Sequence, residues 1–300
     1  MKTLVILTGP TAVGKTSISI NLAKKLKTEI ISCDSRQFYK ELKIGVASPS
    51  DKDLKKIKHH FIGNISIQKK YSAGLFEKDA LRLIENLLIK KNHALLVGGS
   101  GLFIDAVCNG FNTFPNIKSK VRNKLNDLFK KKGIKAIQQQ LEKLDPTYFS
   151  VVDINNPQRI IRALEVCLVA NKPYSHFLNQ KKEIRNFNIK KICLNIPRNL
   201  LYERINKRVD KMIEIGLIEE ARSLYHFRNL NALQTVGYKE LFTHFDGKTT
   251  LNEAIKEIKK NTRRYAKRQL TWFKKDPSIN WVNSKDPIIN SKKVLELLNN

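Results

Sequence analysis

The sequence predicts an α/β protein in which a parallel β-sheet flanked by helices is interrupted by an all-helical segment. In the first third of the chain, strand-length apolar runs alternate with helix-length amphipathic segments, an order that favours parallel strands joined by helices. After Pro115 the pattern stays helical without convincing strands, and a strand-like run returns near residue 190. We therefore expect an α/β core domain over residues 1–112 and 189–300, with a helical insertion domain over residues 113–188.

The first elements follow from hydrophobic patterning. Residues 3–8 (TLVILT) form a continuous apolar run, typical of a strand buried on both faces. Residues 17–26 carry Ile18, Leu22 and Leu26 at helical spacing, so a glycine-bearing loop leads from this strand into a helix. The same reasoning predicts strands at residues 29–32 and 93–97 and a helix at residues 75–90.

The rest of the chain is predicted to be mainly helical. In the insertion we expect helices at residues 118–132, 135–144 and 157–170. A strand at residues 190–196 then rejoins the sheet, followed by helices at residues 200–215, 217–227 and 252–274, a short strand at residues 279–282 and a terminal helix. Parallel strands end at one edge of their sheet, and we expect the ligand site at that edge.

The chain is strongly basic. It has 56 Lys and Arg residues against 27 Asp and Glu, a formal net charge of +29. Because like charges repel one another in the compact state, a fold gains nothing from this excess. The charge indicates a polyanionic partner such as nucleic acid or, less often, an anionic membrane surface. Compositional drift toward Lys and Asn is the alternative, and it accounts for part of the scattered lysines.

Several classes of protein are excluded. No apolar run reaches the roughly 18–20 residues of a membrane span, and the short apolar start runs into a glycine loop instead of a signal-peptide cleavage site. The cysteines are far apart in the sequence (Cys33, Cys108, Cys167 and Cys193). This spacing argues against a zinc site or a disulfide framework, and we expect a protein of the reducing cytoplasm.

The strongest motif lies between the first strand and the first helix. Its residues match G-x-x-x-x-G-K-[ST] and are Gly9, Pro10, Thr11, Ala12, Val13, Gly14, Lys15 and Thr16. Backbone N–H groups of such a loop converge on phosphate at a helix N-terminus, Lys15 reaches the terminal oxygens, and the Thr16 hydroxyl can bind Mg²⁺. A plain turn would leave Lys15 and Thr16 unexplained. The motif predicts a P-loop NTPase-like core that binds a diphosphate or triphosphate.

The P-loop alone does not identify the reaction. One strand leads to Asp34, but the strand at residues 93–97 ends in Gly98-Gly99, and no water-orienting glutamine or arginine finger is obvious. A phosphate-binding transferase therefore fits better than a nucleotide hydrolase.

Further segments occur in the order and form known from one protein family. They are residues 32–39 (SCDSRQFY), 59–62 (HHFI), 71–76 (YSAGLF), 98–103 (GGSGLF), 156–166 (NPQRIIRALEV), 208–212 (RVDKM), 236–241 (VGYKEL) and 262–273 (TRRYAKRQLTWF). With the P-loop they span residue 9 to about residue 273, and the chain resembles the tRNA dimethylallyltransferases, or tRNA isopentenyltransferases. Departures are Ser100 in place of Thr, Phe103 in place of Tyr, and local changes between residues 45 and 66.

The resemblance implies transfer of a dimethylallyl group from dimethylallyl diphosphate to N6 of adenosine 37 in tRNAs that read codons starting with U. Lys15, Arg208 and a Mg²⁺ ion held through Thr16 would then stabilise the leaving diphosphate. Asp34 would accept the N6 proton, although its residue type equally suits a Mg²⁺ ligand. Ser100 matches a position that contacts the adenosine or the donor phosphates. The plain alternatives are a turn serine for Ser100 and a solvated helix arginine for Arg208.

The resemblance also implies a set of tRNA contacts. They are Asp34, Ser35, Arg36, Gln37, Ser100, Arg122, Gln158, Arg159, Ile160, Ile161 and Arg162. The basic segment at residues 256–276 is expected to turn Tyr265, Trp272 and Phe273 inward and its cations toward RNA. The adjacent His59 and His60 are expected to be structural.

The expected partners are a tRNA anticodon stem-loop and dimethylallyl diphosphate, with no membrane and a monomeric protein. Two other functions compete with this one: an ATP-dependent small-molecule or nucleotide kinase, and a non-catalytic RNA-binding P-loop protein. The basic charge disfavours the kinase, and the complete set of Lys15, Thr16, Asp34 and Ser100 disfavours the pure binder.

Overall fold

The computed structural model describes residues 2–110, 114–115, 117–178, 183–283 and 287–299. The chain forms two compact units: unit 1 comprises residues 1–109 and 185–300, and unit 2 comprises residues 110–184. The sequence places the corresponding helical segment at residues 113–188.

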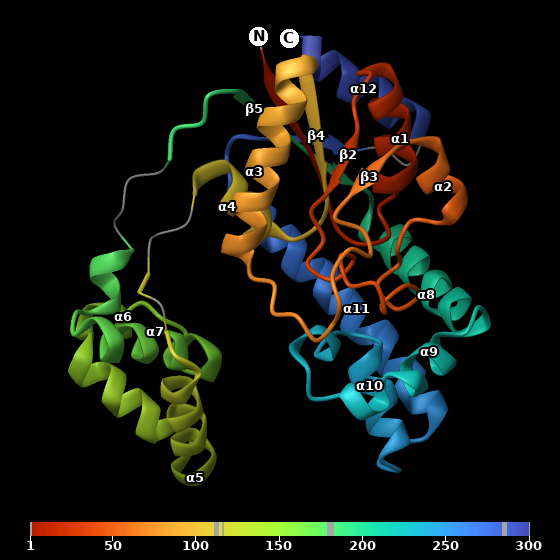
Figure 1. The fold of residues 1–300 in the computed structure, drawn as a ribbon. Helices are drawn as coiled ribbons and strands as arrows, with labels where there is room; N and C mark the ends of the chain where they lie inside the picture. Colours follow the sequence, from red (N-terminus) through yellow and green to blue (C-terminus); the bar gives the residue numbers. More distant parts are fainter. Residues whose placement is uncertain (1, 111–113, 116, 179–182, 284–286, 300) are drawn as a thin grey trace. The chain divides into compact units, whose positions relative to one another are not determined.

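Unit 1 is built on a six-stranded parallel sheet (Figure 1). The order across the sheet is β3-β2-β4-β1-β5-β6, so the strand that follows unit 2 in sequence lies beside the first strand. The predicted α/β fold with a parallel sheet is confirmed. The strands are β1 (Thr3–Thr8), β2 (Ile30–Ser32), β3 (His59–His60), β4 (His93–Val97), β5 (Asn188–Asn195) and β6 (Ile279–Asn283).

Helices cover both faces of this sheet. Leu4 and Ile6 of β1 belong to one hydrophobic cluster, which also includes residues of α3 (Ala73–Lys90) and α4 (Gly101–Asn109). The alternate residues Val5 and Leu7 belong to a second cluster, which includes residues of α1 (Lys15–Lys25) and α12 (Pro287–Asn299). These four side chains are fully buried, which is why the strand is apolar at each position between its terminal threonines.

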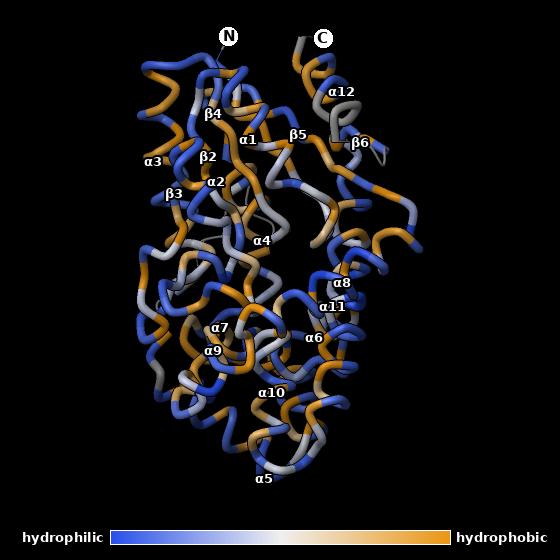
Figure 2. Tube along the Cα trace, turned by 90° about the vertical axis from the view of Figure 1, so that its right-hand side faces the viewer, coloured by the Kyte–Doolittle hydropathy of each residue, from blue (hydrophilic) through white to orange (hydrophobic). Residues whose placement is uncertain are grey.

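Further helices lie beyond the carboxyl ends of the strands (Figure 1). They are α8 (Arg198–Glu214), α9 (Leu217–Ser223), α10 (Tyr238–Phe245) and α11 (Leu251–Phe273), and the short α2 (Asp51–Lys56) precedes β3. The traces of α8 and α11 are largely hydrophilic, unlike the strands of the sheet (Figure 2). No helix within the described ranges is long and apolar enough to cross a membrane.

Unit 2 has its own helical core. Its elements are α5 (Ser119–Leu144), α6 (Pro146–Phe149), α7 (Pro157–Ala170) and a 3₁₀ turn at Tyr174–Phe177. Gly133 has a φ of 73° and breaks α5, so the two helices expected at residues 118–132 and 135–144 are the two halves of this element. The buried Asp145 carboxylate accepts hydrogen bonds from the N–H groups of Tyr148 and Ser175, which ties the turn to α6.

Candidate active site

The phosphate loop connects β1 to α1 at the carboxyl edge of the sheet. Gly9 and Gly14 have φ values of 144° and 104°, which side chains other than glycine rarely adopt. A Cβ atom on Gly9 would also lie only 2.6 Å from the carbonyl oxygen of Leu194. Both glycines of the motif are therefore required by the backbone, as the motif predicts.

The side chain of Lys15 folds back onto the phosphate loop. Its Nζ donates hydrogen bonds of 2.9 Å to the carbonyl oxygens of Gly9 and Pro10. Burial, followed by the charge of Arg208, lowers the pKa of Lys15 to about 8. Two cations enclosed near each other are unfavourable without an anion, so this part of the loop is suited to bind a phosphate group.

Asp34 follows β2 at the same edge. Its Oδ1 accepts a 2.9 Å hydrogen bond from the N–H of Arg36. Burial raises the pKa of the Asp34 carboxyl, and the Arg36 amide and the Lys15 charge oppose this effect only in part. A carboxylate with a raised pKa is a stronger base, and such groups gather at functional sites.

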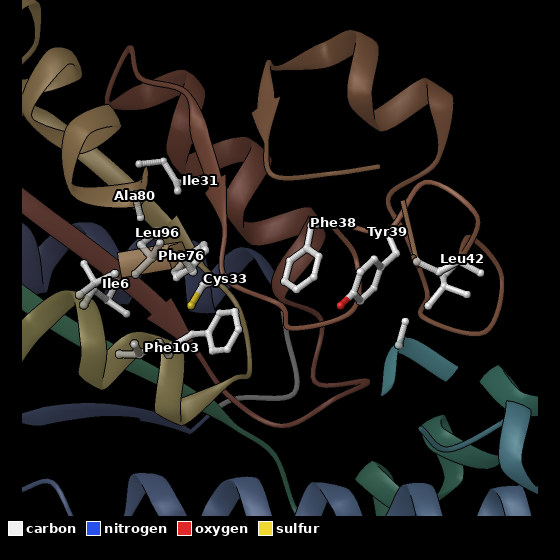
Figure 3. Packing of buried hydrophobic residues seen from close by; sticks show 14 of the residues in the cluster. Ile6, Ile31, Cys33, Phe38, Tyr39, Leu42, Phe76, Ala80, Leu96 and Phe103 are labelled. Carbon is white, nitrogen blue, oxygen red and sulfur yellow. The ribbon is translucent and has the colours of Figure 1, made fainter. Parts of the chain in front are cut away.

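The turn after Asp34 is anchored in the hydrophobic core. Phe38 stacks on Phe103 of α4 with ring centroids 6.2 Å apart, and Phe103 in turn contacts Phe76 of α3 at 4.9 Å. Figure 3 shows Phe76 and Phe103 beside Cys33, and Phe38 next to Tyr39. The packing holds the short segment from Cys33 to Phe38 in place, which fixes the position of the Asp34 carboxylate.

Ser100 follows β4 and lies close to the turn that holds Asp34. Its Oγ accepts a 3.0 Å hydrogen bond from the N–H of Ser35, and its hydroxyl also interacts with Tyr265 of α11. The preceding Gly98 touches the backbone of Cys33, where a Cβ atom would lie 1.9 Å from the carbonyl oxygen. Ser100 is therefore part of a network at the site and more than a residue of a glycine turn.

Two cavities share Asp34 as a wall residue. One, of about 60 Å³, is called the polar cavity here because most of its lining residues are polar, among them Lys15, Thr16, Ser32 and Gln37. The other, of about 110 Å³, is lined by Thr11, Arg36 and Arg208, by Tyr265, and by apolar side chains including Val46, Val209, Met212, Leu217, Val236 and Ile258. The carboxylate thus lies between a phosphate-binding loop and a largely apolar pocket.

Arg208 is directed into this site from α8. Its Nη1 donates a 3.4 Å hydrogen bond to the hydroxyl of Thr11 in the phosphate loop. Burial lowers the pKa of the Arg208 guanidinium. A solvated helix arginine would show neither feature, so the structure brings Arg208 together with the phosphate loop.

The segment after Asp34 contains residues expected to contact tRNA, and one of them has another role. Arg36 lines the larger cavity and donates a hydrogen bond to Asn231. The Gln37 amide instead donates to the carbonyl oxygens of Val46 and Ala47 and accepts from Ser32. In this conformation its side chain holds the Val46–Ala47 loop, and the contact of Gln37 with tRNA stays a prediction.

The remaining expected tRNA contacts lie in unit 2, and they differ in how far their side chains are exposed. Ile160 and Ile161 are 0% and 5% exposed, and their side chains pack in the hydrophobic core of this unit; contact of these two positions with tRNA stays a prediction. Gln158 and Arg159 are exposed on the first turn of α7.

A buried carboxylate positions the two other arginines of unit 2. Glu165, 0% exposed, forms a two-pronged ion pair with Arg122 and a longer one of 3.5 Å with Arg162. The guanidinium of Arg162 also lies 5.0 Å from the ring centre of Phe114. Both arginines remain partly exposed, so they are held in fixed directions while still accessible to a ligand.

The basic segment at residues 256–276 orients its aromatic residues only partly as expected. Phe273 is buried, whereas Trp272 is 39% exposed and donates from Nε1 to Asp105. Tyr265 faces the larger cavity, where burial and the nearby Asp34 carboxylate raise the pKa of its phenol. The expectation that all three rings turn inward is thus wrong for Trp272, because Asp105 fixes that indole near the surface.

Glu220 of α9 is an important residue that no motif indicated. Its carboxylate accepts hydrogen bonds from the N–H groups of Lys43, Ile44 and Gly45 at 2.8–3.0 Å and from the Tyr238 hydroxyl at 2.6 Å. This contact holds the loop that lines the larger cavity. Tyr238 lies within the segment at residues 236–241, but the pairing joins parts of the chain too distant in sequence to be deduced from it.

Of the two adjacent histidines, His60 has the structural contact that was expected. It forms a 2.6 Å contact with Glu29 beside the short strand β3. His59 lines the polar cavity. Among the residues that the structure describes, no group of three or more His, Cys, Asp or Glu side chains could hold a metal ion. Thr16 and Asp34, both at the polar cavity, offer hard oxygen ligands of the kind Mg²⁺ uses together with substrate phosphates.

The lowered pKa of Lys15 predicts a pH dependence. The free protein loses the Lys15 proton as the pH rises through about 8, while an anionic ligand requires the charged form. The ratio kcat/KM for a diphosphate substrate should therefore fall above pH 8 by about tenfold per pH unit. Initial rates at low donor concentration measure this decline, and Lys15→Met should abolish the inflection. A wild-type profile that stays flat to pH 10 would contradict the assignment.

The chain is similar in sequence to members of one protein family. A sequence model of the IPP transferase family matches residues 37–276. A tRNA dimethylallyltransferase of Christiangramia forsetii is 54% identical, over 98% of this chain and 97% of that protein.

Solved structures are similar over nearly the whole chain. A full-length tRNA isopentenylpyrophosphate transferase of Bacillus halodurans has a TM-score of 0.72 and 37% identity, covering 100% of this chain and 95% of that one. A eukaryotic dimethylallyltransferase whose structure was determined while acting on tRNA has a TM-score of 0.79 and 26% identity, covering 95% of this chain and 75% of that one.

Proposed function

Since the chain belongs to the IPP transferase family, we propose that it transfers a dimethylallyl group from dimethylallyl diphosphate to N6 of adenosine 37 in tRNA. The chain is an enzyme that prenylates tRNA, as its relatives are named. The observation that carries the detailed proposal is the place of Asp34, between the phosphate loop and a largely apolar pocket. A carboxylate there can act on an acceptor while the loop holds the leaving diphosphate.

The donor diphosphate would bind at the phosphate loop. The Lys15 ammonium and the Arg208 guanidinium both lie at this loop. Negative charge grows on the diphosphate as its bond to the allylic carbon breaks, and fixed cations stabilise that charge in the transition state. The five-carbon group would extend into the apolar pocket that Val209, Met212 and Val236 line.

The acceptor amine would be activated by Asp34. The N6 lone pair of adenine is delocalised into the ring, so the amine is a weak nucleophile. As the N6–carbon bond forms and the carbon–oxygen bond to diphosphate breaks, the N6 proton passes to the Asp34 carboxylate. Ser100 and Tyr265 lie beside Asp34 and would orient the adenosine.

Mg²⁺ would be bound by the Thr16 hydroxyl together with diphosphate oxygens and water. The ion would supply further positive charge to the leaving group. Asp34 lines the same polar cavity, so its alternative role as a Mg²⁺ ligand remains a competing proposal that substitution of Asp34 can test.

We propose that tRNAs reading codons that start with U are the substrates and that unit 2 binds the anticodon arm. Exposed Gln158 and Arg159, with Arg122 and Arg162 held by Glu165, present donors suited to phosphate and base edges. A loop nucleotide is easier to flip out than a paired one. We further propose a monomeric protein that acts in the reducing cytoplasm, where its four buried cysteines stay free.

Binding to tRNA is expected to weaken steeply with salt. Each phosphate neutralised by Lys or Arg releases condensed counterions, so about five contacts would lower the affinity by roughly 10²–10³-fold between 50 and 200 mM salt. Filter binding of a labelled anticodon stem-loop at several salt concentrations measures the slope. Affinity independent of salt would indicate that the net charge of +29 is compositional drift.

The position of modification tests the proposed function directly. The enzyme, Mg²⁺ and dimethylallyl diphosphate are incubated with a stem-loop carrying adenosines at positions 36, 37 and 38, and the digested RNA is analysed by mass spectrometry. We expect the mass of one dimethylallyl group on adenosine 37 alone. Modification of another position, or of a stem-loop with guanosine at position 37, would contradict the proposal.

A further inference from the structure

Gln269 is a buried polar residue on α11 that connects two halves of the site. Only 7% of it is exposed. Its Oε1 accepts a 2.9 Å hydrogen bond from the N–H of Thr11, and its Nε2 donates a 2.9 Å hydrogen bond to the carbonyl oxygen of Gly99. One side-chain amide therefore bridges the phosphate loop and the turn that follows β4.

Each end of this hydrogen-bonded bridge is connected to residues that take part in the proposed reaction. Thr11 belongs to the phosphate loop, and its hydroxyl accepts a hydrogen bond from Arg208. Gly99 directly precedes Ser100, whose hydroxyl is bonded to the backbone beside Asp34. The bridge thus links the residues around the diphosphate with those around the acceptor amine.

The fit at Gly99 is close. A Cβ atom on Gly99 would lie 2.2 Å from Nε2 of Gln269, so only glycine allows the amide to approach. One helical turn on either side of Gln269, Tyr265 contacts Ser100, and Trp272 packs on Gly101 and bonds to Asp105. This face of α11 holds the whole turn after β4.

We propose that Gln269 is a positioning residue that sets the distance between the phosphate loop and the Ser100–Asp34 group, and therefore between donor carbon and acceptor amine. The inference rests on the proposed prenyl transfer. An amide is required because it donates and accepts at once without charge, whereas a carboxylate only accepts and an alkyl group does neither.

Loss of the bridge should affect the chemical step more than binding. Without it, the loop keeps the Lys15 contacts with Gly9 and Pro10, and Ser100 keeps its bond from Ser35. Each substrate therefore retains its own contacts, but the relative placement of the two is relaxed. A misplacement of about 1 Å lowers a reaction rate by about 10²-fold, which is the effect expected for Gln269→Leu.

The experiment is a single-turnover measurement with both substrates saturating. The rate is divided by the fraction of protein that binds both pyrophosphate and tRNA, which gives a rate per competent site. A loss of rate caused by partly unfolded protein is thereby removed. Gln269→Leu should react about 10²-fold more slowly per competent site, with both dissociation constants within about threefold of wild type. The matched control is Gln68→Leu, at an exposed glutamine between β3 and α3 that lines neither cavity of the site, and it should keep the wild-type rate.

A second variant tests the direction of the hydrogen bonds. In Gln269→Glu an ionised carboxylate still accepts from Thr11 but repels the Gly99 carbonyl, whereas the protonated acid donates to it. The ratio of the variant rate to the wild-type rate should therefore rise as the pH falls. Two results would overturn the positioning role. One is a Gln269→Leu variant that reacts at the wild-type rate per competent site. The other is a Gln269→Glu variant whose rate, relative to wild type, does not change with pH. A wild-type protein that does not alkylate RNA would overturn the proposed function and this role with it.

Discussion

Replacement of Asp34 by asparagine is expected to lower kcat by about 10²–10⁴-fold, the usual contribution of a general base. Asparagine keeps an oxygen that can accept from the Arg36 N–H, as Oδ1 does now, so the turn should remain folded. The affinity for tRNA should stay within about threefold, because one of many contacts changes. Steady-state prenylation and stem-loop binding measure the two effects separately.

Two controls distinguish the roles of Asp34. Asp53→Asn removes a carboxylate that pairs with Lys56 on α2, outside the site, and should leave kcat unchanged. If Asp34 instead served mainly as a Mg²⁺ ligand, a large excess of Mg²⁺ should restore much of the activity of Asp34→Asn. Equal losses of kcat and tRNA affinity would contradict the base role.

Replacement of Lys15 by methionine is expected to raise KM for dimethylallyl diphosphate by about tenfold to a hundredfold. A hydrogen bond to a charged group contributes about 1.5–3 kcal/mol, and methionine keeps the aliphatic stem but loses the ammonium. Inhibition by pyrophosphate should weaken to a similar extent, while the affinity for tRNA should not change. Competition between pyrophosphate and the labelled donor measures the effect.

The matched variant for this prediction is Lys24→Met, at an exposed lysine on the last turn of the same helix. It should leave KM for the donor at the wild-type value. If Lys15→Met weakened only tRNA binding, the phosphate loop would hold RNA, and the placement of the donor diphosphate would be wrong.

The sequence predicts the main elements well where a periodic pattern is long. Strands such as β1 and β4 and helices such as α3 and α11 agree with expectation within a few residues. The strand β3, of two residues, and the helix α4, which begins inside a glycine-rich turn, were not predicted. Such short or glycine-led elements form because they pack on the sheet, and their own sequence carries too weak a signal.

The sequence motifs predict the main residues of the site, but they do not reveal its contacts between residues far apart in the chain. The phosphate loop, Asp34, Ser100 and Arg208 meet as the motifs imply. Gln269 and Glu220 contact residues far away in sequence, which periodicity cannot reveal.

The burial of Ile160 and Ile161 follows from the helix on which they lie. With Leu164 they form one apolar face of α7. Helical spacing alone, applied to that segment, would have predicted their burial.

The central claim is that the phosphate loop holds a prenyl donor and not ATP. The amounts of product formed from dimethylallyl diphosphate and from ATP test it most directly. The protein is given Mg²⁺ and an anticodon stem-loop, with either dimethylallyl diphosphate or ATP, and released pyrophosphate, ADP and modified adenosine are counted. We predict one pyrophosphate for each prenylated adenosine, release only when both the donor and the stem-loop are present, and no turnover of ATP. Steady ADP formation from ATP without prenylated adenosine from the donor would contradict the account and identify the phosphate loop as that of a kinase or ATPase.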